Sequence, residues 1–184
     1  MKADPARLGR LITGVGEAVR SAAEPVPHTL LDELVATAVA PFGDPPGRFV
    51  VVVGEERDRL IEGVAEALGR HWGLGGIRPR GLASEGVLRA PALVLALSTS
   101  PASEGLDGIA RVAFGVQNLV LLCAAHGLAT HRTFGPSLVP EAVLDFVASH
   151  LGEAYRQGEL VTMLAVGWPE GETAPVTGDV PAPL

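Results

Sequence analysis

The residues best suited to chemistry come directly after a long apolar segment near the middle of the chain. Together, the segment and the cluster behind it occupy residues 115–135 and read GVQNLVLLCAAHGLATHRTFG. After Gly127, a natural residue to end a helix, comes a polar cluster formed by Thr130, His131, Arg132 and Thr133. Hydroxyls, backbone amides and a planar guanidinium fork suit a phosphate. We therefore expect a loop here, which is either an anion site or a solvated turn with Arg132 paired to an acidic neighbour.

Other common chemistries have little support in the sequence. The five histidines are dispersed and lack HExxH or Cys/His spacing, so no metal site is predicted. The chain has no GxSxG elbow, no GxxxxGK[ST] loop and no GxGxxG turn after a strand. The single cysteine, Cys123, lies in the apolar segment and is expected to be a small buried hydrophobe.

Length and composition favour one globular domain over residues 1–184. The chain is 47% hydrophobic and 19% charged, with a net charge of −7, which argues against disorder and against broad binding to nucleic acid or an anionic membrane. No secretory signal pattern opens the chain, and the longest apolar run is too short to span a bilayer, so we expect a cytoplasmic protein. Lys2 is the only lysine, a composition typical of a GC-rich bacterial genome.

Hydrophobic periodicity predicts the elements that must position the polar cluster. We expect helices over residues 8–22, 30–38, 57–70, 109–125 and 139–151, and buried strands over residues 49–54, 92–99 and 160–168. Thr29 is a candidate cap for the second helix, and Pro140 suits the first turn of the last one. Residues 71–86 are glycine-rich and irregular, with a lid as one interpretation, and residues 169–184 form an extended tail. The expected fold class is α+β.

The helix expected over residues 109–125 is apolar nearly all round. Arg111, Gln117 and Asn118 are its only strongly polar members. Such a helix must be buried on most sides, either within one subunit or between two subunits.

The order of these segments resembles the FMN-dependent nitroreductase family, in particular its short, single-domain branch. RLITGVGEAVRSAAEPVP is similar to the family's opening arginine motif and proline turn, and LLDELVATAVAP with RFVVVV to its second helix and first strand. RAPALVLAL and LVTMLAVGWPEG are similar to its core strand and its last strand and turn. The most specific match is VQNLVLLCAAHGLATHRT, which resembles the family's central helix and following loop.

The resemblance implies an intertwined homodimer, with a mostly antiparallel sheet flanked by helices and the central helix at the subunit interface. It also implies FMN at that interface and NADH or NADPH as the electron donor. Nitroaromatics, quinones or similar acceptors would be reduced by a ping-pong hydride transfer. The residues carried over as FMN contacts are Arg20, Ser21, Arg48, Thr130, His131, Arg132 and Thr133. No catalytic acid or base is implied.

The opening motif has fewer arginines than the family pattern, and the loop after the second helix is shorter. GVGEAVRS supplies only Arg20 and Ser21, where the family normally carries two or three arginines and a serine, and APFGDPPGRF retains only the arginine–phenylalanine end of the following loop. This leaves a second interpretation open, in which a nitroreductase-like dimer has lost flavin catalysis and binds another ligand or a partner.

Overall fold

A computed structural model describes residues 24–42, 47–71, 73, 90–98, 107–133 and 139–169. The helix expected over residues 8–22, with Arg20 and Ser21, lies outside the described residues. So do most of the glycine-rich stretch 71–86 and the tail beyond residue 169.

Four antiparallel strands form one sheet at the centre of the molecule. They are β1 (Gly47–Val53), β2 (Ala92–Ser98), β3 (Ala129–Thr133) and β4 (Glu159–Gly167), in the order β1-β2-β4-β3. The inner strand β2 is buried along its whole length, whereas the edge strand β1 is partly exposed. The expected buried strands are confirmed, and β1 has core on both faces too: Phe49 and Val51 pack on the α2 and α5 side, and Val50 and Val52 pack on the α3 and α6 side.

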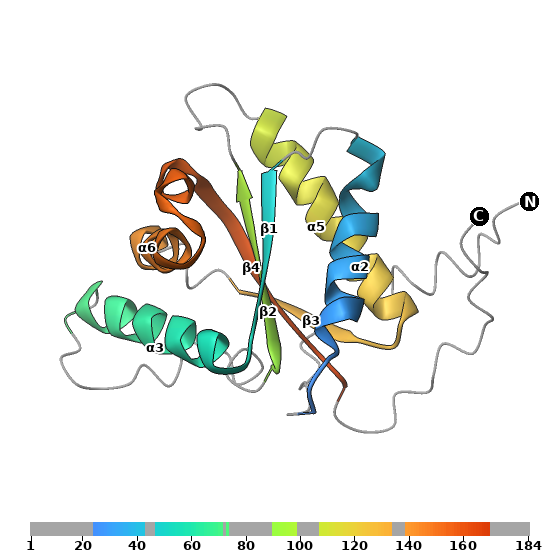
Figure 1. Ribbon diagram of the computed structural model, residues 1–184, viewed down its shortest axis with the longest axis horizontal. Coiled ribbons are helices and arrows are strands. Elements are labelled where there is room, and N and C mark those ends of the chain that lie inside the picture. Colours follow the sequence, from blue (N-terminus) through green and yellow to red (C-terminus); the bar gives the residue numbers. More distant parts are fainter. Residues whose placement is uncertain are drawn as a thin grey trace, which may run out of the picture.

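Helices cover both faces of the sheet (Figure 1). On one face lie α2 (His28–Val39) and α5 (Asp107–Ala125), and on the other lie α3 (Gly54–His71) and α6 (Pro140–Leu151). Short 3-10 turns follow α2 (Ala40–Phe42, η1) and α6 (Glu153–Gln157, η4). The α+β fold class is thus confirmed, with a helix–sheet–helix arrangement.

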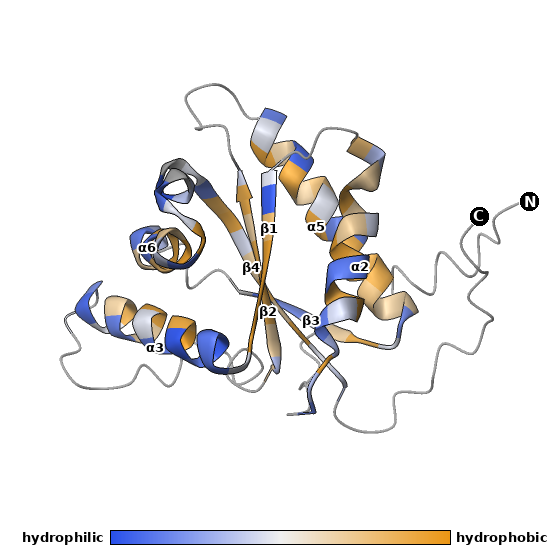
Figure 2. Cartoon of the chain, in the orientation of Figure 1, coloured by the Kyte–Doolittle hydropathy of each residue, from blue (hydrophilic) through white to orange (hydrophobic). Residues whose placement is uncertain are grey.

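Alternation of side chains along the inner strand β2 divides the core into two clusters. In β2, Val94 faces the α2 and α5 side while Leu95 faces the α3 and α6 side. Because side chains of a strand point alternately to opposite faces, a strand that is apolar at every position must be covered twice. Figure 2 shows β1, β2 and much of α5 in the hydrophobic colours, in agreement with a sheet that carries core on both sides.

Gly115 lets α5 pack closely against the first strand. A Cβ atom at this position would lie 2.9 Å from Cζ of Phe49, so any side chain would force the helix and the ring apart. On the side that faces α2, α5 holds this helix and the turn after it through polar contacts. Asn118 donates to the carbonyl of Ala38 at 3.0 Å, and Arg111 donates to the carbonyl of Phe42 at 3.3 Å. The polar residues of this helix therefore satisfy the open carbonyls that end its neighbour.

The ends of the helices agree with the sequence in two of three places. Pro140 stands in the first turn of α6, as expected. Gly127 ends α5 with a φ of 74°, and the amides of Gly127 and Leu128 donate back to the carbonyls of Ala124 and Cys123, which is a Schellman motif. Thr29 is not the cap of α2, because the helix begins at His28, two residues earlier than expected, and Pro27 occupies the cap position.

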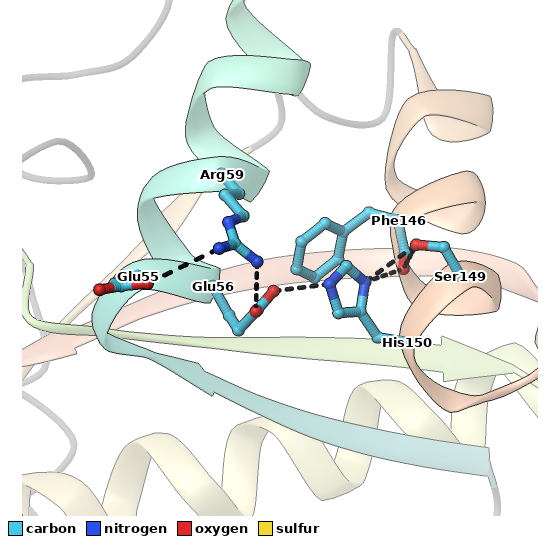
Figure 3. A network of polar contacts seen from close by, with 6 residues as sticks. All are labelled: Glu55, Glu56, Arg59, Phe146, Ser149 and His150. Atoms are coloured by element: carbon cyan, nitrogen blue, oxygen red, sulfur yellow. Dashed lines mark hydrogen bonds and ion pairs between the residues drawn. The ribbon is translucent and has the colours of Figure 1, made fainter.

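A network of polar contacts joins α3 to α6 (Figure 3). Nε2 of His150 lies 2.6 Å from Oε2 of Glu56, and Nδ1 lies 2.7 Å from the carbonyl oxygen of Phe146. Arg59 holds the other oxygen of Glu56 at 2.8 Å. Glu56 Oε2 is inaccessible to solvent, and this imidazole is the donor that the described residues offer it. Both ring nitrogens of His150 thus lie within hydrogen-bond distance of an oxygen atom, and Nδ1 also lies 2.9 Å from Oγ of Ser149.

Candidate functional site

The polar cluster that comes after Gly127 is a strand and not a loop. Residues Ala129–Thr133 form β3, which pairs with β4 at the edge of the sheet. The Schellman turn at Gly127 reverses the chain into this strand, so only His126, Gly127 and Leu128 separate the helix from the strand. The predicted loop is therefore wrong.

Strand geometry divides the cluster between the two faces of the sheet. Thr130 pairs with Val166 and Arg132 pairs with Leu164, and both of these partners belong to the core under α2 and α5. His131 pairs with Ala165, which belongs to the core under α3 and α6. Directly paired residues share a face. Thr130 and Arg132 therefore lie on the α5 side and His131 lies on the other side, while the backbone of Thr133 pairs with Met163.

The partner of Arg132 is an amide and not an acid. Nη2 of Arg132 donates to Oε1 of Gln117 on α5 at 2.5 Å. A guanidinium has donors only, so the chemistry requires the oxygen of the amide to face it. The alternative of a solvated turn with Arg132 paired to an acidic neighbour is wrong, because this amide leaves the positive charge of the exposed guanidinium without a counter-ion among the described residues.

Gln117 stands on a face of α5 that the described part of the chain leaves open. The helix buries one side against the sheet and points its opposite side outward. The outward residues are Ala110, Ala113, Phe114, Gln117, Leu121 and Ala124. Phe114 is 63% exposed, which is more than any other large hydrophobic side chain described. By length and composition alone α5 could cross a membrane, but its inner side forms the centre of a domain core.

Arg48 does not join Arg132 within one chain. It lies on β1, at the opposite edge of the sheet, and pairs with Leu97, whose side chain belongs to the core under α3 and α6. Its guanidinium lies over the ring of Tyr155, 5.9 Å from the centroid. Arg48 and Arg132 therefore occupy opposite edges and opposite faces, a separation that depends on strand register and cannot be read from residue spacing.

The first residues that the structure describes, near Pro25, lie beside the beginning of β3. Nε1 of Trp168 donates to the carbonyl of Pro25 at 3.4 Å, and the preceding residue, Gly167, pairs with Ala129. Residues from three distant parts of the sequence thus converge at this end of the sheet. Sequence reasoning missed both Trp168 and Gln117, since each acts through a tertiary hydrogen bond that leaves no local pattern.

Two negative expectations can be examined in the described part of the chain. Those residues contain no group of three or more metal-ligand side chains. Cys123 is buried within the core, and this burial raises the pKa of its thiol to about 12. A neutral, enclosed thiol is a packing residue and not a nucleophile.

The comparisons with known proteins agree with this architecture. The model of the nitroreductase family matches residues 22–168. A solved nitroreductase-like family protein from Bacillus cereus is 21% identical, covering 94% of this chain and 92% of that one, with a TM-score of 0.64. No curated protein matches the chain.

Two further structural neighbours were solved with bound molecules. An FMN-dependent nitroreductase from Mycobacterium smegmatis, in complex with NADPH, is 21% identical over 93% of this chain and 90% of that one, with a TM-score of 0.61. A nitroreductase with bound FMN from Bacteroides fragilis is 14% identical over 98% and 99%, with a TM-score of 0.69.

Proposed function

The chain belongs to the nitroreductase family, and on this premise we propose that it is an FMN-dependent oxidoreductase that works as a homodimer. FMN, when bound, would accept a hydride from NADH or NADPH and pass the electrons to a nitroaromatic, quinone or similar acceptor. The structural neighbours described as FMN-bound and NADPH-bound support this choice of cofactor and donor.

The observation that carries the proposal is the unneutralised guanidinium of Arg132. An exposed arginine whose neighbour is an amide offers several free donors and a full positive charge, which suits the phosphate of FMN. Thr130 lies on the same face of the sheet, two residues away along β3. The residues of this chain therefore fit the anionic end of the cofactor.

Other predicted contacts join this site in different ways. Arg20 and Ser21 precede Pro25, which is held beside the end of β4 by Trp168, so a short length of chain can bring them toward β3. His131 and Thr133 belong to β3 itself. Arg48 lies on the other face and at the other edge, and it contributes only if the second subunit brings its own copy to the site.

The outward face of α5 supports the dimer. It carries Ala110, Ala113 and Phe114, which are exposed in the described part of one subunit, and the half-buried Leu121. Exposed apolar surface of this kind marks an association site. Gln117 lies on the same face, so burial of this helix between subunits would place the seam beside Arg132.

The residues of the chain supply binding and orientation, and none of them is assigned as an acid or a base. Hydride transfer between two flat rings depends on holding them at a defined distance with water excluded. Apolar residues from two copies of α5 would form a surface that excludes water from the site. We expect the protein to act in the cytoplasm.

The direct test is whether the purified protein carries FMN. We expect a yellow protein that releases FMN on denaturation and becomes colourless on addition of NADH or NADPH. FMN added to protein stripped of flavin should raise the free energy of unfolding by about 2.7 kcal/mol at a concentration 100 times its dissociation constant. A colourless protein with no gain in stability would favour the alternative, a dimer that has lost flavin catalysis.

Replacement of Arg132 tests the phosphate assignment. Loss of a hydrogen bond to a charged phosphate corresponds to about 1.5–3 kcal/mol, so Arg132→Ala should weaken FMN roughly 10- to 100-fold. Arg70→Ala is the matched control, because Arg70 is exposed on α3 and its ion-pair partner is Glu66, at 3.6 Å. Equal FMN affinity in both variants would move the phosphate site away from β3.

A further inference from the structure

We infer that Gln117 is a positioning residue, which fixes Arg132 as a phosphate receptor and adds its own amide hydrogens to the donor set. This inference rests on the proposed function. It concerns how the site recognises a phosphate and which residue sets the affinity for that phosphate. The supporting observation is the contact between α5 and β3.

The donors left over at this contact point to an oxyanion. A guanidinium has five N–H groups and a carboxamide has two. One of the seven joins Arg132 to Gln117, and neither residue makes another hydrogen bond to the described part of the chain. Several donors therefore remain side by side, with no acceptor among them. A phosphate monoester offers the complementary set, which is several acceptors and a double negative charge.

This arrangement requires that the side chain of Gln117 is uncharged. A carboxylate in the same place would form a bidentate ion pair with Arg132, cancel its charge and occupy the two N–H groups that a phosphate needs. An apolar side chain would remove the anchor and leave the long side chain of Arg132 free to sample many rotamers. Only a side chain that accepts a hydrogen bond without negative charge both orients the guanidinium and leaves it receptive.

The backbone holds the two residues in register. Arg132 is fixed on β3 by pairing with Leu164, and Gln117 is fixed on α5 between Val116, which is buried, and Asn118, which binds α2. The receptor thus connects a helix and a strand of the core, and it does not depend on a loop.

Two phosphates could supply this chemistry, that of FMN and the additional phosphate that distinguishes NADPH from NADH. The test therefore compares ligand pairs that differ by this group alone. The dissociation constants of FMN and riboflavin are measured for the wild type, Gln117→Glu, Gln117→Leu and Arg132→Ala, and the Michaelis constants for NADPH and NADH are measured on flavin-loaded enzyme.

We expect Gln117→Glu to weaken FMN by tenfold or more, on the order of one lost bond to a charged group, while riboflavin affinity stays the same. Gln117→Leu should weaken FMN less, and the dependence of FMN affinity on salt should fall most in the glutamate variant. The unfolding temperature without ligand, measured for each variant, separates a loss of fold from a loss of binding. The Gln117 variants could instead lose the preference for NADPH over NADH and keep the ratio of FMN to riboflavin affinity. Arg132 and Gln117 would then bind the additional phosphate of NADPH, and the inference stands.

The failures can be told apart. If Arg132→Ala loses the phosphate preference and both Gln117 variants keep it, Gln117 has no positioning role and the inference is overturned while the proposed function stands. If all three variants keep both preferences, the phosphate assignment in the proposed function is wrong and the inference falls with it. A protein that binds neither flavin overturns both.

Discussion

Replacement of Phe114 by alanine should break the dimer. Phe114 belongs to the outward face of α5 and is 63% exposed in the single chain. A phenylalanine side chain presents roughly 200 Å² of apolar surface, so about 130 Å² is available for burial at a subunit interface. At about 25 cal/mol per Å², complete burial stabilises the dimer by about 3 kcal/mol per subunit.

A twofold interface contains this side chain twice, so the single substitution acts twice. Alanine keeps part of the area, which leaves a loss of about 4–5 kcal/mol per dimer and a rise of roughly a thousandfold or more in the dissociation constant. FMN affinity should fall as well, because the proposed site lies at the seam.

The assay is sedimentation equilibrium over a wide range of protein concentration. Leu151→Ala is the matched control, since Leu151 is the other large hydrophobic residue described as exposed, at 49%, and it lies at the end of α6 on the far side of the sheet. The reasoning is refuted if the wild type is a monomer. It is also refuted if the dissociation constant of the Phe114→Ala dimer lies within a few-fold of the value for Leu151→Ala.

Three further predictions concern stability. Burial raises the pKa of Cys123 from 9.0 to about 12, so the unfolded chain loses this proton at a lower pH than the folded chain. The free energy of unfolding should therefore fall by up to about 1.4 kcal/mol per pH unit as the pH rises between these values. Urea titrations of Cys123→Ala should show a smaller fall with pH, and an unchanged fall would contradict the assignment. Gly115→Ala should cost about 1–3 kcal/mol through overpacking, whereas Gly63→Ala, with open space around its Cβ, should gain about 0.5–1 kcal/mol in thermal unfolding; similar values for both would refute the packing argument. A double-mutant cycle on Glu56→Gln and His150→Gln should give a coupling of about 0.2–1 kcal/mol, since both side chains are partly exposed; a coupling of zero would mean that the contact adds nothing.

The parts of the fold that the sequence predicts are those with a strong and local hydrophobic pattern. The strand β2 is apolar at nearly every position, and α5 is a long apolar helix that ends at a glycine. Such segments form the same element in almost any context that buries them. The local hydrophobic pattern therefore predicts their bounds to within one or two residues.

The edge strand β3 could not be predicted in this way. Its sequence, ATHRT, offers no buried run, and it becomes a strand through its pairing with β4, a segment far along the chain. Propensity and pattern describe a segment by itself, whereas an edge strand is defined by hydrogen bonds to a distant partner. The four polar residues therefore looked like one loop, although the pleat separates them onto two faces.

The same register decides which arginines can act together. Arg48 and Arg132 both stand in strands and both match the family resemblance, but they lie at opposite edges and on opposite faces of the sheet. Among the described residues of one subunit, Arg132 is the one of the two that faces the open apolar helix and the amide of Gln117. If Arg48 contacts the same flavin, it must come from the other chain.

A mixed dimer tests this arrangement, with Arg48→Ala in one subunit and Arg132→Ala in the other. If each site combines Arg48 of one subunit with Arg132 of the other, one site loses both arginines and the second keeps both. Flavin titration should then show half of the sites binding FMN with the wild-type affinity. If each site instead draws both arginines from one subunit, every site lacks one arginine, and no site with the wild-type affinity should remain.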